Sequence, residues 1–258
     1  MSELATRKAV KERYAKLAAA ADSAGRDDGC CDSATTLSLE SVPGEASSVS
    51  AGCGSPLILV SPKKGDVVLD LGSGGGIDVF RAAVIVGGKG RAIGVDATPE
   101  MVWRARETKS KYGSKYANVE FRLGEIEHLP IHSESVDYII SNCVINLSPD
   151  KLAVFRESYR VLKAGGTFAV ADVTLPKEIP SSAREDMDSW SACIAGALTD
   201  ASYKRLLQRA GFQDVQIEHI SYSNIGEYPF RYHSSHIKAR KPVIGSLKSR
   251  SLLPLSRP

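Results

Sequence analysis

The chain has 258 residues, of which 43% are hydrophobic and 24% charged, a composition typical of a globular protein with a sizeable core. Its net charge of +3 belongs to one end, because residues 228–258 hold seven Lys or Arg and no acid, which leaves −4 on the rest. An acidic body gives no support to nucleic-acid binding, and no apolar run is long enough to cross a bilayer. No apolar leader follows a basic start, so we expect a cytoplasmic protein without a membrane partner.

The N-terminal part is predicted to form a helix and a lid. Residues 5–21 indicate one helix with Tyr14 and Leu17 on one face, which either caps a ligand or packs on the sheet. Residues 22–56, rich in Ser, Gly and Asp, indicate a loop or lid. This lid carries three of the five cysteines, namely Cys30, Cys31 and Cys53. Cytoplasmic cysteines are more often reduced, reactive or ligating than part of a disulfide framework. The adjacent pair either exchanges with a distant thiol or has no role.

A glycine loop follows the first predicted strand, in the run VVLDLGSGGGID. Residues 67–71 read as a buried parallel strand that ends beside Asp70. The glycines stand in the register GxGxG, at Gly72, Gly74 and Gly76. A dinucleotide fingerprint would need its third glycine, or an alanine, where Ile77 stands. The loop therefore favours S-adenosylmethionine over NAD.

A second acid ends the next predicted strand, residues 91–96. Asp96 lies twenty positions after Gly76, the spacing at which an α/β nucleoside site places a carboxylate for the ribose hydroxyls. The alternative is that Asp96 is only an N-terminal acid of the helix that begins at Pro99. The loop and the two strand-end acids together indicate a nucleoside-type site.

Later strands bring further side chains to the same edge of the sheet. Strand 119–123 is followed by Glu125 and Ile126, which would suit an adenine amino group and its ring face. Strand 136–144 brings Asn142 and Cys143 to this edge. The other predicted elements are helices at 99–112, with Thr98 as N-cap, 149–162, 183–195, with Cys193 near its end, and 200–210, and strands at 167–173, 215–220 and 236–241.

The alternation of strands and helices predicts an α/β fold. We expect a Rossmann-like, mostly parallel, seven-stranded sheet with helices on both faces, whose last two strands pair antiparallel. The basic segment 242–258, rich in Pro and Ser, is predicted to be a disordered tail.

The chemistry of methyl transfer limits the classes of acceptor that fit this sequence. A sulfonium methyl group is electrophilic, so the enzyme chiefly has to aim a nucleophile at it. No general base for an oxygen or nitrogen acceptor stands out at the carboxyl ends of the strands. Cys143 stands there instead, with the other four cysteines in flanking segments. Thiolates are soft ligands for arsenic(III), which keeps a lone pair when three thiolates hold it.

Over residues 60–241 the glycine loop and acid spacing resemble the class I S-adenosylmethionine methyltransferases. Six runs resemble one family within them, the arsenite S-adenosylmethionine methyltransferases: LDLGSGGGID, GVDATPEM, LGEIEHLP, SNCVINLSPDK, RVLKAGG and CIAGAL. The shorter members carry a CC pair and a GCG-Pro motif, which Cys30-Cys31 and residues 52–56 resemble. SNCVINLSPDK is the most specific run, because other methyltransferases rarely have cysteine there. Ser55 departs from the family, which usually has Asn.

This resemblance implies transfer of methyl groups from S-adenosylmethionine to thiol-bound trivalent arsenic, which serves detoxification. It implies Cys143 and Cys193 as the arsenic-binding pair, Cys53 as a third thiol, and Cys30 or Cys31 as a disulfide partner in a redox relay. It implies cofactor contacts at Asp70, Gly72, Ser73, Gly74, Gly76, Asp96, Ala97, Met101, Glu125, Ile126 and Asn142. A thiol reductant, thioredoxin or glutathione, would be the co-substrate of a monomeric enzyme without a metal.

Composition and resemblance together divide the chain into an N-terminal helix and lid at 1–56, a methyltransferase domain at 57–241 and a tail at 242–258. Two other functions stay open. An enzyme of this fold could methylate a quinone or another small carbon acceptor, in which case the cysteines would be dispensable. The protein could also bind arsenic without catalysis. For Cys143 and Cys193 the structural alternative is that they are small buried hydrophobic residues.

Overall fold

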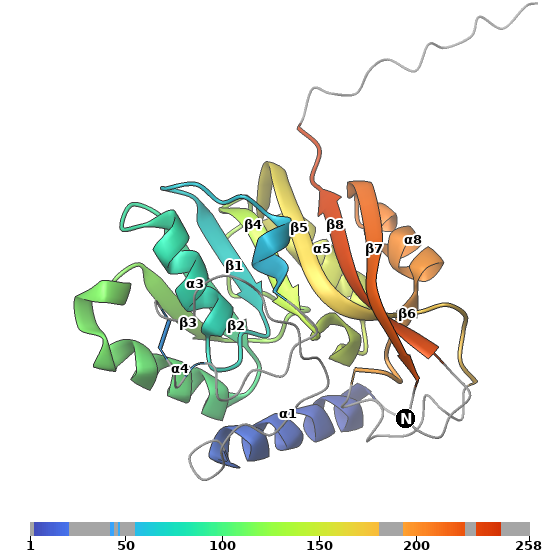
Figure 1. Ribbon diagram of the computed structural model, residues 1–258, viewed down its shortest axis with the longest axis horizontal. Coiled ribbons are helices and arrows are strands. Elements are labelled where there is room, and N and C mark those ends of the chain that lie inside the picture. Colours follow the sequence, from blue (N-terminus) through green and yellow to red (C-terminus); the bar gives the residue numbers. More distant parts are fainter. Residues whose placement is uncertain are drawn as a thin grey trace, which may run out of the picture.

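The computed structural model describes residues 3–20, 42, 43, 46, 55–180, 193–224 and 231–243. A mixed sheet forms the middle layer of this part, and helices cover both of its faces (Figure 1). The strand order is β3-β2-β1-β4-β5-β8-β7, with a short β6 paired to β5. Strands β1 to β5 are parallel to one another, whereas β8 is antiparallel to β5 and β7. The predicted α/β class is confirmed, with β6 as an additional strand.

The strands are β1 (Val67–Leu71), β2 (Arg91–Asp96), β3 (Val119–Leu123), β4 (Val136–Asn142), β5 (Leu162–Leu175), β6 (Leu198–Thr199), β7 (Gln213–Asn224) and β8 (Arg231–Arg240). The α-helices are α1 (Glu3–Ala20), α3 (Ile77–Val86), α4 (Pro99–Lys111), α5 (Lys151–Val161) and α8 (Asp200–Arg209). Short 3-10 helices are η2 (Pro56–Leu59), η3 (Gly113–Tyr116) and η4 (Ile145–Leu147). None of these described helices is long and apolar enough to cross a membrane.

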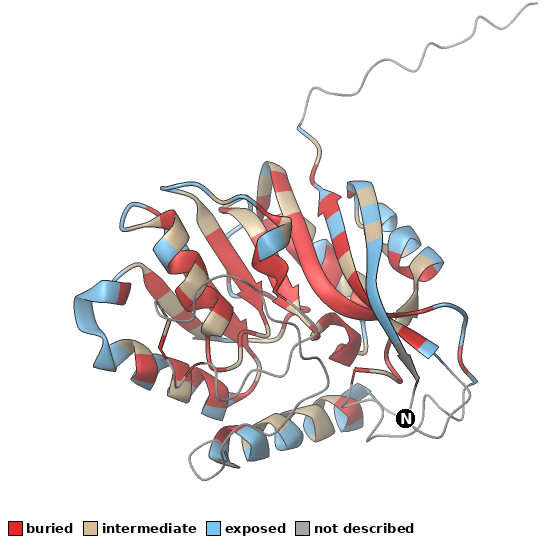
Figure 2. Ribbon diagram, in the orientation of Figure 1, coloured by how far each residue is buried: buried red, intermediate tan, exposed pale blue. Residues whose placement is uncertain are grey.

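The sheet separates two hydrophobic cores. Successive residues of a strand point to opposite faces, so Val68 of β1 belongs to the core under α3 and α4 while Leu69 belongs to the core under α5 and α8. The central strands are buried on both faces (Figure 2), which explains their short β-branched runs. These two cores hold the carboxyl ends of the strands in place, and α1 lies across that edge (Figure 1).

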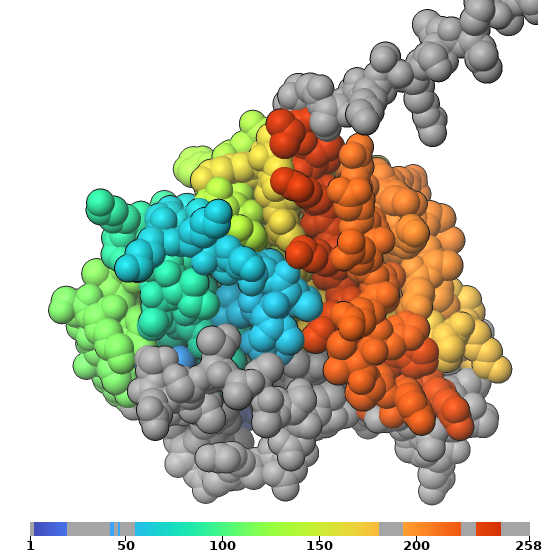
Figure 3. Space-filling view, turned by 45° about the horizontal axis from the view of Figure 1, so that its top comes forward, coloured from blue at the N-terminus to red at the C-terminus, as the bar shows by residue number. Residues whose placement is uncertain are grey.

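The antiparallel end of the sheet is more open to solvent. Residues 213–222 of the edge strand β7 are exposed or half-buried, as Figure 2 shows. On the face seen in Figure 3, η2 lies beside β8, and it contacts both β5 and β8. The predicted antiparallel pairing of the last two strands is therefore confirmed, although both strands are longer than the pattern indicates.

Several boundaries differ from those predicted. Strand β4 ends at Asn142 rather than at residue 144, because the backbone of Cys143 turns to a φ of 54°. Strand β5 starts at Leu162, directly after α5, and continues to Leu175. Cys193 lies in a turn with a φ of 66°, so the expected helix does not extend through residues 193–195. Residues 183–192 of that expected helix, most of the lid 22–56 and residues 244–258 of the tail lie outside the described residues. The proposed domain boundaries stay predictions.

Candidate active site

A cavity opens at the carboxyl edge of the sheet, between the ends of β1 and β4. The chain runs from β1 outward to β2 and β3 and then returns to β4 on the other side of β1. Such a reversal of strand order leaves a crevice in which open α/β sheets bind ligands. Helix α1 closes the cavity from outside with Arg7, Val10, Lys11 and Tyr14.

The glycine loop forms one wall of the cavity. Gly72, Gly74 and Gly76 have φ values of 69°, 49° and 90°, which favour glycine. A Cβ on Gly72 would lie 2.4 Å from the side chain of Val144, and one on Gly76 would lie 2.5 Å from Phe121. A Cβ on Gly74 would meet nothing within 4 Å. The outer two glycines therefore serve packing, whereas Gly74 leaves space at the cavity for a ligand to approach the backbone.

Asp96 ties the end of β2 to the glycine loop. Its carboxylate accepts hydrogen bonds from the backbone N–H of Gly74 and of Thr98, both at 2.8 Å. Burial raises the pKa of Asp96, although these two hydrogen bonds act in the opposite direction. Each carboxylate oxygen can accept a second hydrogen bond, and Asp96 lines the cavity. The predicted position at the strand end is correct, but sequence reasoning missed the role of Asp96 in holding the loop.

Two more buried acids line the cavity. Burial, together with the negative charges of Asp78 and Asp96, raises the pKa of Asp70 well above its ordinary value. Burial also raises the pKa of Asp78, whose carboxylate lies 3.1 Å from the guanidinium of Arg81. A cationic ligand would favour the ionised form of these acids. The electrostatics thus suit a ligand that carries positive charge.

The structure brings the predicted cofactor residues together around this cavity. Those that line it are Asp70, Gly72, Ser73, Gly74, Asp96, Ala97, Met101, Glu125, Ile126 and Asn142. Gly76, in contrast, serves as the N-cap of α3 and packs against Phe121. Sequence reasoning missed Asp78, Val144 and Leu147, which also line the cavity. It left open whether the first helix caps the ligand, and the structure places α1 over the cavity.

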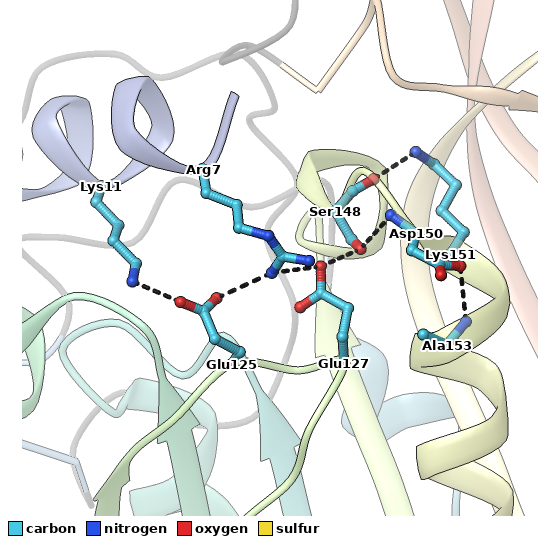
Figure 4. Close-up of polar contacts among 8 residues, drawn as sticks. All are labelled: Arg7, Lys11, Glu125, Glu127, Ser148, Asp150, Lys151 and Ala153. Carbon is cyan, nitrogen blue, oxygen red and sulfur yellow. Dashed lines mark hydrogen bonds and ion pairs between the residues drawn. The ribbon is translucent and has the colours of Figure 1, made fainter. Parts of the chain in front are cut away.

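An ionic cluster fixes α1 to the loop after β3 (Figure 4). The guanidinium of Arg7 lies 2.9 Å from the carboxylate of Glu127 and 3.4 Å from that of Glu125. Lys11 donates a short hydrogen bond to Glu125. Ser148 donates to Glu127 at 2.6 Å, and Glu127 is buried. Glu125, predicted to contact an adenine amino group, therefore also anchors α1.

Cys143 and Cys193, the two cysteines among the described residues, lie side by side at the same edge. The thiol of Cys193 donates to the backbone carbonyl of Cys143 at 2.7 Å, and both residues are buried. Both have positive φ, which costs a residue with a side chain about 1–2 kcal/mol. Cys143 is disulfide-bonded, with its partner outside the described residues, whereas Cys193 is not in a disulfide. Cys30, Cys31 and Cys53 also lie outside the described residues.

An apolar cluster surrounds the cysteine pair. Cys143 and Cys193 pack with Leu147, Val173, Leu175, Ile179, Ala197 and Tyr232, and partly with Val10, Tyr14 and Ile194. Three of these residues, Val10, Tyr14 and Leu147, also line the cavity. Burial raises the pKa of Tyr14 above its ordinary value, and the charge of Cys193 raises it further, so the hydroxyl stays protonated. The cysteine pair and the cavity are thus neighbours that share one wall.

Comparison with known proteins places this arrangement in context. Residues 62–211 match the family described as a methyltransferase domain. The chain is 43% identical, over 92% of its length, to an arsenite methyltransferase of Halobacterium salinarum, of which it covers 67%. The arsenite methyltransferase of Homo sapiens is 40% identical over 62% of this chain, which spans only 44% of the human protein.

Two solved structures that this chain resembles are also methyltransferases. The chain is similar to an arsenic (III) S-adenosylmethionine methyltransferase from Chlamydomonas reinhardtii, with 36% identity, a TM-score of 0.69 and coverage of 80% of this chain and 73% of that one. A phosphoethanolamine N-methyltransferase 2 from Haemonchus contortus has 17% identity and a TM-score of 0.61, over 74% of this chain and 53% of that chain. The second likeness concerns the fold alone.

Proposed function

Since the chain belongs to the arsenite methyltransferases, within the wider methyltransferase-domain family, we propose that it transfers methyl groups from S-adenosylmethionine to thiol-bound trivalent arsenic. One observation carries the proposal for the acceptor. Cys143 and Cys193 touch each other beside an acid-lined cavity, with 2.7 Å between the sulfur of Cys193 and the carbonyl oxygen of Cys143. Soft thiolates are the ligands that arsenic(III) prefers.

The cavity fits S-adenosylmethionine, which has a cationic sulfonium and no phosphate. Gly74 leaves space beside its backbone, and the buried acids Asp70 and Asp96 complement positive charge. Buried Met101 and Ile126 offer apolar contacts for an adenine ring. The bound cofactor would supply an electrophilic methyl group. We assign Asp96 to the ribose hydroxyls, to which its remaining lone pairs are suited.

The residues of the chain itself bind and aim the acceptor. Each arsenic–sulfur bond forms as an arsenic–oxygen bond breaks, and the thiol proton leaves with the hydroxide as water. Cys143 and Cys193 would supply two sulfur ligands, and Cys53 the third. The arsenic lone pair is then the nucleophile, so no general base is required.

Thiol redox chemistry belongs to the proposal. Cys143 is disulfide-bonded, so it must be reduced before it can bind arsenic. Methylation at the lone pair formally oxidises arsenic from the trivalent to the pentavalent state, a loss of two electrons. Oxidation of two thiols to a disulfide supplies two electrons, which reduce arsenic to the trivalent state again. We propose that Cys30 or Cys31 takes part in this exchange and that thioredoxin or glutathione regenerates the thiols. A monomer in the reducing cytoplasm, acting in arsenic detoxification, fits this requirement.

The decisive experiment follows methyl groups on arsenic. Purified protein is incubated with arsenite, S-adenosylmethionine and excess thiol, and the arsenic species are separated. We expect methylated arsenicals from the wild type and none from Cys143→Ser, which should still bind S-adenosylmethionine. Asp96→Ala should weaken cofactor binding with the fold intact. Full turnover by Cys143→Ser would return the protein to the small-molecule methyltransferases, whereas arsenite binding without methylation would identify a non-catalytic protein.

A further inference from the structure

A buried polar pair lies behind the cysteine site, between η4 and β5. The side-chain amide of Asn146 donates to Oδ1 of Asp172 and to the backbone carbonyl of Val173, both at 2.8 Å. Asn146 and Asp172 are fully buried. An amide nitrogen has two hydrogens to donate, and both are used here. We propose that Asn146 and Asp172 are positioning residues that hold the Cys143–Cys193 pair in the geometry needed to chelate one arsenic atom.

Asn146 lies three positions after Cys143, so the pair acts on Cys143 through a short stretch of backbone. The backbone N–H of Cys143 donates to the carbonyl of Ala171 at 2.8 Å, and Asn146 binds the next two residues of β5. The turn that follows β4 is therefore fastened to β5 at both of its ends. A non-glycine residue with a φ of 54°, as at Cys143, persists only where its surroundings over-determine the backbone. Asn146 and Asp172 supply that constraint.

The same constraint reaches Cys193. Its thiol donates to the carbonyl of Cys143, so a shift of the turn moves the hydrogen-bond acceptor that orients the second sulfur. On the other side Lys151 donates from Nζ to the carbonyl of Asn146 at 3.3 Å and to that of Ser148 at 2.8 Å. The backbone of the turn is thereby held on both sides, and Asn146 is the side chain that links it to β5.

Position, rather than charge, is the property that Asp172 contributes. Burial raises the pKa of Asp172 to about 7, against the effects of the hydrogen bonds from Val173 and Asn146 and of the Lys151 charge. Its Oδ1 accepts from both donors in either protonation state. Its Oδ2 and the nearby hydroxyl of Tyr203 make no hydrogen bond of normal geometry within the described part of the chain. An amide at position 172 can therefore keep the acceptor and donate to Tyr203.

The test separates chelation by two thiols from the reactivity of one. The full-length chain is prepared with Cys30, Cys31 and Cys53 replaced by serine, so that two thiols remain, and it is reduced with a phosphine. The probe is phenylarsine oxide, whose two exchangeable positions form two As–S bonds with loss of water and no redox change. Its affinity is measured by calorimetry, alongside the rate of thiol alkylation by iodoacetamide and the affinity for S-adenosylmethionine.

In this background we expect Asn146→Ala to bind the probe about tenfold more weakly, because two hydrogen bonds that hold the turn are lost. Alkylation and cofactor affinity should stay within about twofold, as expected for an effect on geometry alone. Asp172→Asn should match the parent, whereas Asp172→Ala should resemble Asn146→Ala. Ser158→Ala on α5 is the matched control, since its buried hydroxyl makes no hydrogen bond within the described residues. In chains with all five cysteines, Asn146→Ala should raise KM for arsenite and not for the cofactor.

The outcomes distinguish this inference from the proposed function on which it rests. If the parent fails to chelate the probe, the arsenic function itself is wrong and the inference falls with it. If the parent chelates and Asn146→Ala chelates equally well, only the positioning role is wrong. Equal losses of probe and cofactor affinity would also overturn it, because they indicate general structural damage. Should Asn146→Ala fail to fold, Asn146→Ser, which keeps a hydroxyl donor, should show a smaller loss of the same kind.

Discussion

Removal of the Arg7 side chain tests how much the docking of α1 contributes to stability and to the affinity for S-adenosylmethionine. Arg7 reaches Glu127 at 2.9 Å, and their side chains are 24% and 3% exposed. Arg7→Ala leaves the buried Glu127 carboxylate with Ser148 as its remaining hydrogen-bond donor within the described residues. A hydrogen bond to a charged group contributes about 1.5–3 kcal/mol. Because Arg7 is a quarter exposed, we take the lower part of this range, about 1.5–2 kcal/mol.

This free energy sets the expected loss of cofactor affinity. If α1 is mostly undocked in the ligand-free protein and S-adenosylmethionine binds tightly only to the docked form, the whole loss appears in Kd, which rises by about 10- to 30-fold. If α1 is instead docked before the ligand binds and unfolds together with the body, Kd stays nearly unchanged and the same loss lowers the melting temperature of the ligand-free protein by about 3–8 °C. Titration calorimetry with S-adenosylmethionine measures the first quantity, and a thermal melt measures the second.

A matched control lies on the same helix. Lys8 pairs with Glu12 at 3.8 Å, with side chains 75% and 61% exposed, so Lys8→Ala removes a cation from α1 without touching the cavity. We expect wild-type affinity from it. An unchanged Kd together with an unchanged melting temperature for Arg7→Ala would refute the energetic role of the contact between Arg7 and Glu127. An equal loss in Lys8→Ala would instead point to the helix as a whole rather than to the contact with Glu127.

Three further predictions follow from charge, anchoring and ligand number. Burial raises the pKa of Asp70, so the melting temperature of the ligand-free protein should fall as pH rises through that raised pKa. Over the same pH range the affinity for S-adenosylmethionine, measured by calorimetry, should rise. Asp70→Asn should flatten both pH profiles. Removal of residues 244–258 should leave activity and melting temperature unchanged, whereas Lys241→Met should lower the melting temperature, because Lys241 Nζ donates to two backbone carbonyls. Cys53→Ser should lose methylation of arsenite but keep that of a monomethyl trivalent substrate, whereas Cys143→Ser should lose both in product assays.

The parallel half of the sheet could be predicted from the sequence because its signals are local. Strands β1, β2 and β3 begin and end at the predicted residues, since short β-branched runs between turn residues have few alternative structures. The glycine register is equally local. Gly72 and Gly76 have positive φ and leave no space for a Cβ, so only glycine suits these two positions, and the sequence shows their spacing.

Contacts between distant segments could not be predicted in the same way. The pattern of the first helix placed Tyr14 and Leu17 on one face, yet Tyr14 packs against the cysteine cluster while Leu17 is 39% exposed. The partners of Arg7 lie more than a hundred residues away. No local pattern marks such a pair. The left-handed turn at Cys143 was also missed, because cysteine carries no turn preference and the apolar run continues past it.

Because the cavity and the cysteines share a wall, one helix borders both of the proposed binding sites. The sheet reverses its strand order between β1 and β4, which places the glycine loop and Asp96 on one side of the crevice and the cysteine turn on the other. Tyr14 belongs to the lining of both sides, and the ion pairs of Arg7 fasten the same helix about two turns away. Undocking of α1 would therefore expose the cofactor cavity and the apolar surroundings of the thiols together. A reactive methyl donor and an oxidisable thiol pair both gain from exclusion of water, and in this fold one docking event excludes it from both.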